Sequence, residues 1–188
     1  MKQTVKYHLS GASPLMMHNG RLSDPLDEWA QRIKTITAKR KKTDADHEEI
    51  GRLEWFGSLY LFNGAPCIPR EAIKATLIRA GATLKKSPKV KAGIVCEEHV
   101  PVLYEGPTDP KALWDDGRFV SRMSKKMGQV RVIRTRPLFF PWEMVLLLAF
   151  NDETLNPKEV DELLDIAGHS IGFLEERPEY GRFNVHKL

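Results

Sequence analysis

The sequence predicts an α+β protein with a ferredoxin-like, RRM-like core in the order strand, helix, strand, strand, helix, strand. Two observations predict it: residues 2–10 alternate apolar and polar side chains, and the remaining strand and helix segments follow in this order once the insertions are removed. A chain of 188 residues is long enough for one domain with insertions. We therefore expect a single domain over 1–188, with insertions at 11–69 and 105–128.

The first third of the chain contains one core strand and most of the first insertion. Residues 2–10 alternate apolar and polar side chains, which predicts a half-buried strand. A helix is expected over 24–36, with Asp24 as its N-cap and a proline in its first turn. A second helix is expected over 44–56, and an Asn-Gly dipeptide predicts a hairpin over 59–68.

The middle of the chain supplies the first core helix and the two central strands. The apolar spacing predicts a helix over 69–84 and a strand over 93–104. Prolines, glycines and mixed charge make 105–128 an irregular excursion. Strands are expected again over 129–137 and 141–150.

The second core helix has the clearest start signal in the sequence. Asn156, Pro157 and Glu159 supply a side-chain acceptor, a preset backbone angle and the carboxylate of a capping box. We expect this helix to end at Gly168, because glycine commonly follows the last helical residue. The last strand is expected over 183–186.

Charge is distributed unevenly along the chain. Residues 143–188 hold ten acids and four bases, which leaves 25 bases and 15 acids in residues 1–142. A polyanion is the natural partner of such a basic part, and a solvated basic surface without a partner is the alternative. Composition alone favours neither.

Several classes of protein are excluded at this level. The longest apolar run is seven residues, 144–150, far short of the ~20 that span a membrane. The start lacks the apolar core of a secretion signal, and the two cysteines form neither a disulfide framework nor a zinc site. No phosphate-binding glycine motif of a nucleotide cofactor is present. We therefore expect a cytoplasmic protein without cofactors.

The strongest binding signal is a basic stretch that contains no acid from Gly117 to Trp142. Phe119 lies within it, and basic charge with an aromatic side chain suits a strand of phosphates and unstacked bases. The alternative is a flexible charged loop, and the strand parity does not show which bases share a face. The seven bases are Arg118, Arg122, Lys125, Lys126, Arg131, Arg134 and Arg136, with Met123 and Met127 between them.

Two further basic clusters are candidates. Arg70 and Lys74 lie one turn apart near a helix start, where the helix dipole adds positive potential, so replacing both is expected to weaken anion binding. Glu71 can compensate these charges internally, which is the alternative. The second cluster is Lys39, Arg40, Lys41 and Lys42.

The C-terminal segment carries three glycines, Gly168, Gly172 and Gly181. Glycine lets the backbone approach a phosphate and direct N–H groups toward it, although an ordinary chain-reversing turn has the same composition.

Catalytic patterns are weak. None of the six histidines has the spacing of a metal-binding helix, and His18 and His169 lie in irregular segments where general bases occur. Asp24 and Asp27 fit helix capping better than an acid–base pair.

Three segments together resemble the RAMP superfamily, the RNA-binding subunits of CRISPR effector complexes, and within it their backbone subunits. The segment 13–20, SPLMMHNG, is similar to the family's "PL" segment, which precedes a glycine. The segment 68–79, IPREAIKATLIR, is similar to the segment that opens the first core helix, with Arg70-Glu71 in place of small residues. The segment 172–183 is similar to the family's glycine-rich loop, with a bulky acidic stretch between its glycines.

The resemblance implies that the chain coats single-stranded nucleic acid, RNA in preference to DNA, through phosphate contacts. His18, Asn19 and Arg21, the pair Arg70 and Lys74, and the loop with Gly172 and Gly181 would flank the strand. The excursion 105–128 would replace the family's thumb, and the two charge halves suit head-to-tail stacking or assembly with other subunits of a ribonucleoprotein. The chain is short for such a subunit, which fits a reduced, phage-encoded relative.

Two alternative functions stay open. The first is a metal-independent endoribonuclease with His18 or His169 as general base; Asp24, the one candidate for the aspartate of cleaving backbone subunits, fits a helix cap better. The second is a protein-interaction module that mimics a backbone subunit and inhibits a CRISPR complex. We expect a binding protein that is not an enzyme.

Overall fold

The computed structural model describes residues 1–188, except for the side chain of Met127. The chain forms two compact units, each built from non-contiguous segments. The first unit comprises 1–16, 61–106 and 139–188, and the second comprises 17–60 and 107–138. The second unit thus contains most of the two segments that we expected as insertions.

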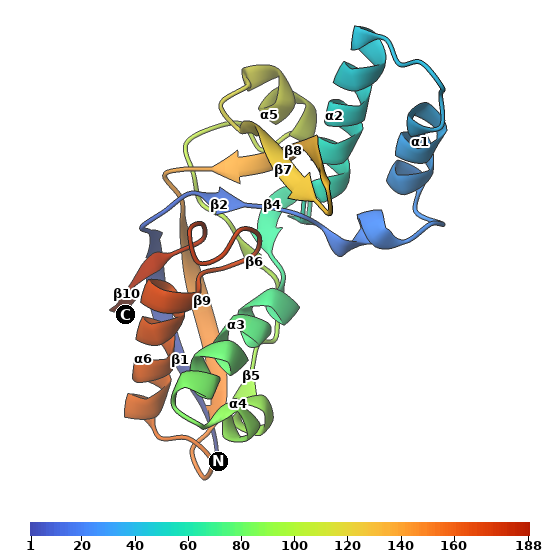
Figure 1. Ribbon diagram of the computed structural model, residues 1–188. Coiled ribbons are helices and arrows are strands. Elements are labelled where there is room, and N and C mark those ends of the chain that lie inside the picture. Colours follow the sequence, from blue (N-terminus) through green and yellow to red (C-terminus); the bar gives the residue numbers. More distant parts are fainter. The chain divides into compact units, whose positions relative to one another are not determined.

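The structure is mixed α and β (Figure 1), and its strands pair antiparallel in several sheets. The elements of the first unit are β1 (Lys2–Gly11), β2 (Leu15–Met16), β3 (Leu61–Phe62), β4 (Ala65–Ile68), α3 (Arg70–Thr83), α4 (Ser87–Gly93), β5 (Ile94–Val95), β6 (Val100–Pro101), β9 (Glu143–Asn151), α6 (Pro157–Ile166), the π-helical turn η2 (Ala167–Ile171) and β10 (Phe183–Lys187). Those of the second unit are the 3-10 turn η1 (Gly20–Ser23), α1 (Glu28–Thr37), α2 (Asp44–Ser58), α5 (Pro110–Asp116), β7 (Val120–Met127) and β8 (Val130–Phe139), whose last residue belongs to the first unit.

The main sheet of the first unit has the strand order β10-β1-β9-β5. Along the chain its strands and helices follow as β1, α3, β5, β9, α6 and β10, and α3 and α6 lie on one face of the sheet (Figure 1). The alternation predicted for β1 is confirmed, because Tyr7 and Leu9 are buried while Lys6 is exposed. Each of the two helices therefore connects strands that have another strand between them.

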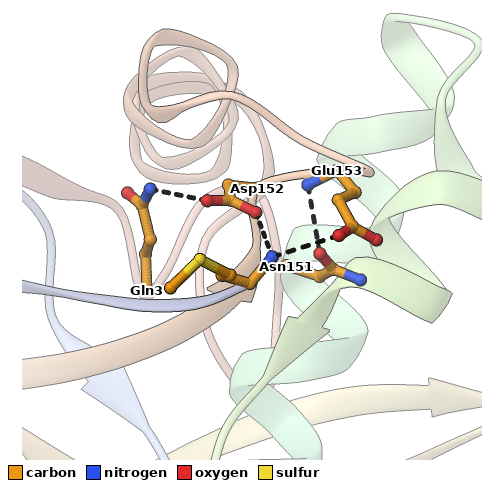
Figure 2. Close-up of polar contacts among 5 residues, drawn as sticks. Gln3, Asn151, Asp152 and Glu153 are labelled. Atoms are coloured by element: carbon orange, nitrogen blue, oxygen red, sulfur yellow. Dashed lines mark hydrogen bonds and ion pairs between the residues drawn. The ribbon is translucent and has the colours of Figure 1, made fainter.

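The turn between β9 and α6 is fastened to the start of β1. The side-chain amide of Gln3 donates to the Asp152 carboxylate at 2.8 Å, and the N–H of Glu153 donates to Asn151 Oδ1 at 3.0 Å (Figure 2). Beyond this turn, the capping box predicted at Asn156 is confirmed, with its side chain accepting from the N–H of Glu159 at 3.0 Å. These local contacts fix where α6 begins.

The second unit packs around aromatic side chains of α2. Trp55 is fully buried, and its indole N–H donates to the carbonyl of Phe119 at 2.9 Å. Its ring lies edge-on to Trp114 of α5 at 5.6 Å between centroids. Phe56 stacks on Trp29 of α1 at 5.8 Å, so α2 holds both neighbouring helices.

The expected strand over 93–104 is wrong. Its residues form the end of α4 and two short strands, β5 and β6, which pair with different partners, β9 and β4. Between them Glu97 and Glu98 are exposed, because consecutive charged side chains do not suit a buried strand. The excursion 105–128 is more regular than expected, since it contains α5 and β7.

Two helix boundaries also differ from the expectation. The N-cap of α1 is Asp27, which accepts from the N–H groups of Trp29 and Ala30, whereas Asp24 accepts from Leu26 in the preceding turn. At the other end of the chain, the helix does not stop at Gly168 but continues as η2. Gly168 is needed there because an added Cβ would lie 2.2 Å from the Phe183 carbonyl oxygen.

In the part of the chain that the structure describes, no helix is both long and apolar enough to span a membrane.

Candidate nucleic-acid interface

The register of the β7–β8 hairpin settles which bases share a face. Arg122 pairs with Thr135, and Lys126 pairs directly with Arg131. Paired residues of antiparallel strands point to the same face, and so do alternate residues along each strand. Arg122, Lys126 and Arg131 therefore lie on one face, which we call the outer face. All three side chains are exposed, whereas Thr135, opposite Arg122 on the same face, is buried against Gly51 of α2.

The outer-face cations lack internal compensation. Among the described side chains, none of the three has a hydrogen bond or ion pair with another residue. Lys126 and Arg131 lie directly opposite each other, an arrangement of like charges that destabilises a strand pair. An anion bound between them would offset that repulsion. Ile133, 52% exposed, adds an apolar contact on the same face.

Arg134 and Arg136 belong to the opposite, inner face and are held by Glu54 of α2. Glu54 is 3% exposed, forms an ion pair with Arg134, and lies 3.9 Å from Arg136. Its carboxylate also accepts from the N–H of Thr135 at 3.0 Å. The sequence analysis assigned no role to Glu54. The one signal for its burial was a carboxylate between two large apolar residues of a helix. These two arginines hold the hairpin to α2.

His18 lies close to the same inner-face charges. Burial and the neighbouring Arg136 and Arg134 guanidiniums lower the pKa of His18 to about 4, so the imidazole is neutral near pH 7. Its Nδ1 is buried without a hydrogen-bond partner in the described part of the chain, as is Ser58 Oγ. A neutral imidazole with this pKa is a weak proton acceptor near pH 7.

Asn19 and Arg21 have structural tasks at the end of α2. Arg21 donates from Nε to the carbonyl of Gly57 and from Nη2 to the carbonyl of Phe56, both at 3.0 Å. Asn19 donates from its side-chain amide to the carbonyl of Leu59 at 3.1 Å. A cation that hydrogen-bonds the last carbonyls of a helix also matches the negative end of its dipole.

The basic loop between α1 and α2 divides into paired and unpaired cations. Lys39 forms an ion pair with Asp46 at 2.6 Å, and Lys42 donates to the carbonyl of Lys39 at 3.1 Å. Arg40 and Lys41 are exposed and have no such contact among the described side chains.

Three other members of the basic stretch differ from the outer-face cations. Arg118 forms a two-pronged ion pair with Asp116, at 2.7 and 2.9 Å, and Lys125 is half-buried on the inner-face side. Phe119, expected to stack on bases, is 5% exposed and belongs to the core of the second unit. Burial of its apolar ring stabilises the core of the second unit, so the ring is not available to stack on a base.

Arg70 and Lys74 lie at the start of α3 as predicted, but both side chains form their polar contacts with other residues of the first unit. Arg70 pairs with Glu71 at 2.9 Å and donates to the carbonyl of Glu97 at 3.0 Å. Lys74 donates to the carbonyl of Ile94, and burial lowers its pKa. The internal compensation considered for this helix start is therefore present.

The glycine-rich loop 172–182 uses its N–H groups internally. Gly172 donates to the carbonyl of Ala167 at 2.8 Å, and Gly181 donates to the carbonyl of Pro14 at 2.7 Å. Both have positive φ, and a Cβ at Gly181 would lie 2.1 Å from the Phe173 carbonyl oxygen. The glycines permit close backbone approach, but of the chain to itself rather than to a phosphate.

The three segments that carry the family resemblance converge around this loop. Besides the contact of Gly181 with Pro14, the N–H of Arg182 donates to Ser13 Oγ at 3.0 Å. From the helix segment, Thr76 Oγ1 donates to the carbonyl of Gly172 at 3.3 Å. Both other segments thus bond to the glycine-rich loop, across 96 to 169 positions of sequence, and form one hydrogen-bonded cluster in the first unit.

Metal-binding and catalytic chemistry have less support in this structure. Among the described side chains, no group of three or more His, Cys, Asp or Glu residues could hold a metal ion. Both cysteines are free. His169 is exposed and contacts the carbonyl of Asp165 at 3.0 Å, in the first unit, whereas His18 belongs to the second.

No protein-family model and no curated protein matches this sequence. Among solved structures, the chain is similar to Cmr6 from Pyrococcus furiosus, with 9% sequence identity, 99% of each chain covered and a TM-score of 0.39. At this TM-score the likeness carries no argument about fold or function.

Proposed function

We propose that the chain binds single-stranded nucleic acid, with RNA as its preferred ligand, through phosphate contacts on the outer face of the β7–β8 hairpin. The observation that carries this proposal is the alignment of Arg122, Lys126 and Arg131, exposed and without internal partners among the described side chains. In our proposal the chain is a non-enzymatic backbone-type subunit of a cytoplasmic ribonucleoprotein. The preference for RNA and the partner subunits come from the family resemblance.

The spacing of the outer-face cations suits an extended strand. Lys126 lies four positions after Arg122, which corresponds to about 13 Å along a β-strand. That distance is long enough for more than one phosphate of a single strand to lie along the hairpin. In the described part of the outer face there is no aromatic side chain, so affinity would come from charge rather than from base stacking.

The order of strands and helices in the first unit also supports the family resemblance. We interpret its sheet and two helices as a ferredoxin-like core, because the chain order β1, α3, β5, β9, α6, β10 is the order of that unit. The sheet order β10-β1-β9-β5 follows when each helix crosses over one intervening strand. The convergence of the three resembling segments on the glycine-rich loop fits the same interpretation.

The test is a binding titration of a fluorescently labelled, mixed-sequence single-stranded RNA. The triple variant Arg122→Ala/Lys126→Ala/Arg131→Ala is expected to bind about tenfold or more weakly, since each lost phosphate contact weakens binding and lowers the salt dependence. A matched DNA strand in the same assay tests the preference for RNA.

The control removes the same number of charges elsewhere. Lys89, Lys91 and Lys158 are exposed residues of the first unit, and their triple alanine variant is expected to retain most of the affinity. Equal losses in both triple variants would show that net charge alone matters and would contradict a site on the hairpin. A wild-type protein that binds no nucleic acid would favour the protein-interaction alternative.

A further inference from the structure

The main sheet of the first unit has α3 and α6 on one face (Figure 1), and its opposite face, which we call the open face, carries exposed apolar side chains. Val145 and Leu147 are alternate residues of β9, and the residue between them, Leu146, is buried in the core. Val145 is 37% exposed and Leu147 is 58% exposed. The solvated face of an antiparallel sheet usually carries polar side chains, so an apolar row on it indicates contact with something outside the unit.

Two neighbouring segments extend this apolar row at its ends. Leu103 and Glu143 exchange two backbone hydrogen bonds of 2.8 Å at the start of β9. Near the other end of the strand, Val95 of β5 pairs with Ala149. Paired residues of antiparallel strands point to the same face, and Leu103 and Val95 are both nearly half exposed. The row follows β9 from 143 to 149, about 20 Å, and a contiguous exposed apolar surface marks an interaction site.

The two ends of the open face differ in charge. Lys6 pairs with Leu147 across β1 and β9, is exposed, and has no ion pair among the described side chains. Glu143 lies four positions before Leu147, about 13 Å away along β9, and one of its carboxylate oxygens contacts His8 Nε2 at 3.0 Å. Glu105, near Glu143, is exposed and has no ion pair in the described part of the chain. One end is therefore basic and the other acidic.

A cavity of about 450 Å³ lies at the acidic end of the open face. It suits a lysine side chain, because the alkyl stem of lysine packs on apolar surface while its ammonium group seeks carboxylates. The cavity offers both kinds of surface, since it is lined by Leu103, Tyr104, Glu105, Pro141, Trp142 and Glu143.

A second copy of the chain is complementary to the open face in one orientation. A two-fold axis that lies between two facing sheets and runs across their strands reverses the direction of β9 in the second copy. The two apolar rows then pack on each other, and Lys6 of each copy comes opposite Glu143 and the cavity of the other copy. An axis parallel to the strands would instead bring the two acidic ends together, which like charges disfavour. Sheets that pack face to face commonly keep their strands within about 30° of alignment, which this arrangement permits.

Single-stranded nucleic acid fits the open face less well. Its acidic end repels phosphates, and none of its described residues on β1, β5 and β9 is a Phe, Tyr or Trp on which a base could stack. By strand pairing, these residues are Thr4, Lys6, His8, Ser10, Val95, Glu143, Val145, Leu147 and Ala149.

We propose that the open face is the interface of a symmetric dimer, in which two copies pack their β9 rows antiparallel and Lys6 of each copy enters the cavity of the other. A two-fold contact closes with two copies, whereas head-to-tail stacking continues into a filament. The interface lies in the first unit and needs no nucleic acid, so it is independent of the proposed function.

The first test is sedimentation velocity of the full chain, purified free of nucleic acid, over a range of concentrations. We expect a monomer–dimer equilibrium whose mass stops at two chains. The variant Val145→Thr/Leu147→Thr keeps β propensity but removes apolar surface from both copies, so its dissociation constant is expected to rise about tenfold or more. The matched control, Leu61→Thr/Val130→Thr, changes two exposed apolar strand residues elsewhere and should dimerise like the wild type.

The second test exchanges the charges between copies. Lys6→Glu and Glu143→Lys should each weaken the dimer, because each variant brings like charges together at both contacts. In an equimolar mixture, with one variant fluorescently labelled, the charges at both contacts are opposite again. The mixed dimer is therefore expected to form about tenfold more tightly than the dimer of either variant alone. Loss of the contact between His8 and Glu143 affects the Glu143→Lys dimer and the mixed dimer alike, and it cannot produce this preference.

Several outcomes would overturn the interface. A wild type that stays monomeric at every concentration refutes it, as does a mass that grows beyond two chains. Equal weakening in the threonine variant and its control would also contradict it, and a mixed dimer no tighter than the others would refute the antiparallel arrangement. If the variants fail to fold, the sedimentation of the wild type decides the question.

A titration with labelled single-stranded RNA separates this proposal from the proposed function. A monomer whose RNA affinity falls about tenfold in Val145→Thr/Leu147→Thr would assign the open face to nucleic acid and refute the dimer. A dimer that binds no RNA would refute the proposed function and support the interface.

Discussion

The outer face of the β7–β8 hairpin and the start of α3 carry closely spaced cations, but they differ in what surrounds those cations. Arg122, Lys126 and Arg131 are exposed and unpaired among the described side chains. Arg70 and Lys74 instead donate to backbone carbonyls, those of Glu97 and Ile94 respectively.

The difference comes from neighbouring backbone, not from the cations. The chain near α3 forms β5 at the edge of the main sheet and leaves this strand after Val95, so carbonyl groups on its open side and beyond its end need donors. Arg70 and Lys74 supply those donors. In the hairpin, the backbone groups between β7 and β8 bond to each other, and the outer-face side chains, which project from the plane of the sheet, remain available to an external anion.

The largest expected effect concerns the inner face of the hairpin, where Arg134 and Arg136 attach the hairpin to Glu54 of α2. Replacing Glu54 by alanine leaves Arg134 and Arg136 without their carboxylate, and breaking a buried ion pair costs about 3 kcal/mol or more. We expect a clearly lower melting temperature. Glu48→Ala, at an exposed position of the same helix, should change it little, and similar effects of both variants would contradict this role.

The salt dependence of binding measures how many unpaired cations take part. If the three outer-face cations alone contact phosphates, the log–log slope for a single strand is expected near −2, and adding Arg40 and Lys41 brings it to about −3.5. The triple hairpin variant should lower the slope by about 2 units. Affinity that stays flat between low and moderate salt would argue against phosphate-led binding altogether.

The double variant Arg70→Ala/Lys74→Ala tests whether the cations at the start of α3 stabilise the fold rather than bind RNA. Each lost hydrogen bond is worth about 1 kcal/mol, or about 2–4 °C of melting temperature for a protein of this size. RNA affinity should change much less than in the hairpin variant. An unchanged melting temperature with an affinity loss of about tenfold would instead make this helix start a binding site.

The pH dependence of stability tests the surroundings of His18. Its pKa falls from an ordinary 6.5 to about 4 in the folded chain, so between these values the unfolded state binds more protons. Stability should therefore be complete above about pH 6.5 and decrease as the pH falls toward 4. Melting curves of His18→Gln should lose part of this slope, whereas those of His47→Gln, at an exposed site, should keep it.

The smallest expected effect concerns RNA cleavage, where we expect no change. Because we propose a binding protein, His18→Ala and His169→Ala should leave no activity to lose when labelled RNA is incubated without metal. Shortened RNA in the wild type that disappears with either substitution would favour the endoribonuclease. His47→Ala serves as the control for a contaminating nuclease.

Local patterns predicted many elements of this fold. The alternation in β1, the Asn-Gly turn between β3 and β4 and the capping box of α6 depend on residues a few positions apart, and all three are confirmed. The strand expected over 93–104 depended on pairing partners far away in the chain. Those partners, β9 and β4, divided it into β5 and β6.

For the candidate site, the amino-acid order alone gives the inventory of cations and their concentration between Arg118 and Arg136. Long-range packing selects which of these cations are available to a ligand. The register of β7 with β8 assigned the faces, and Glu54 neutralised the inner one. The reason is physical: a charge is compensated by whatever lies within a few ångströms of it, and that neighbourhood is set by long-range packing.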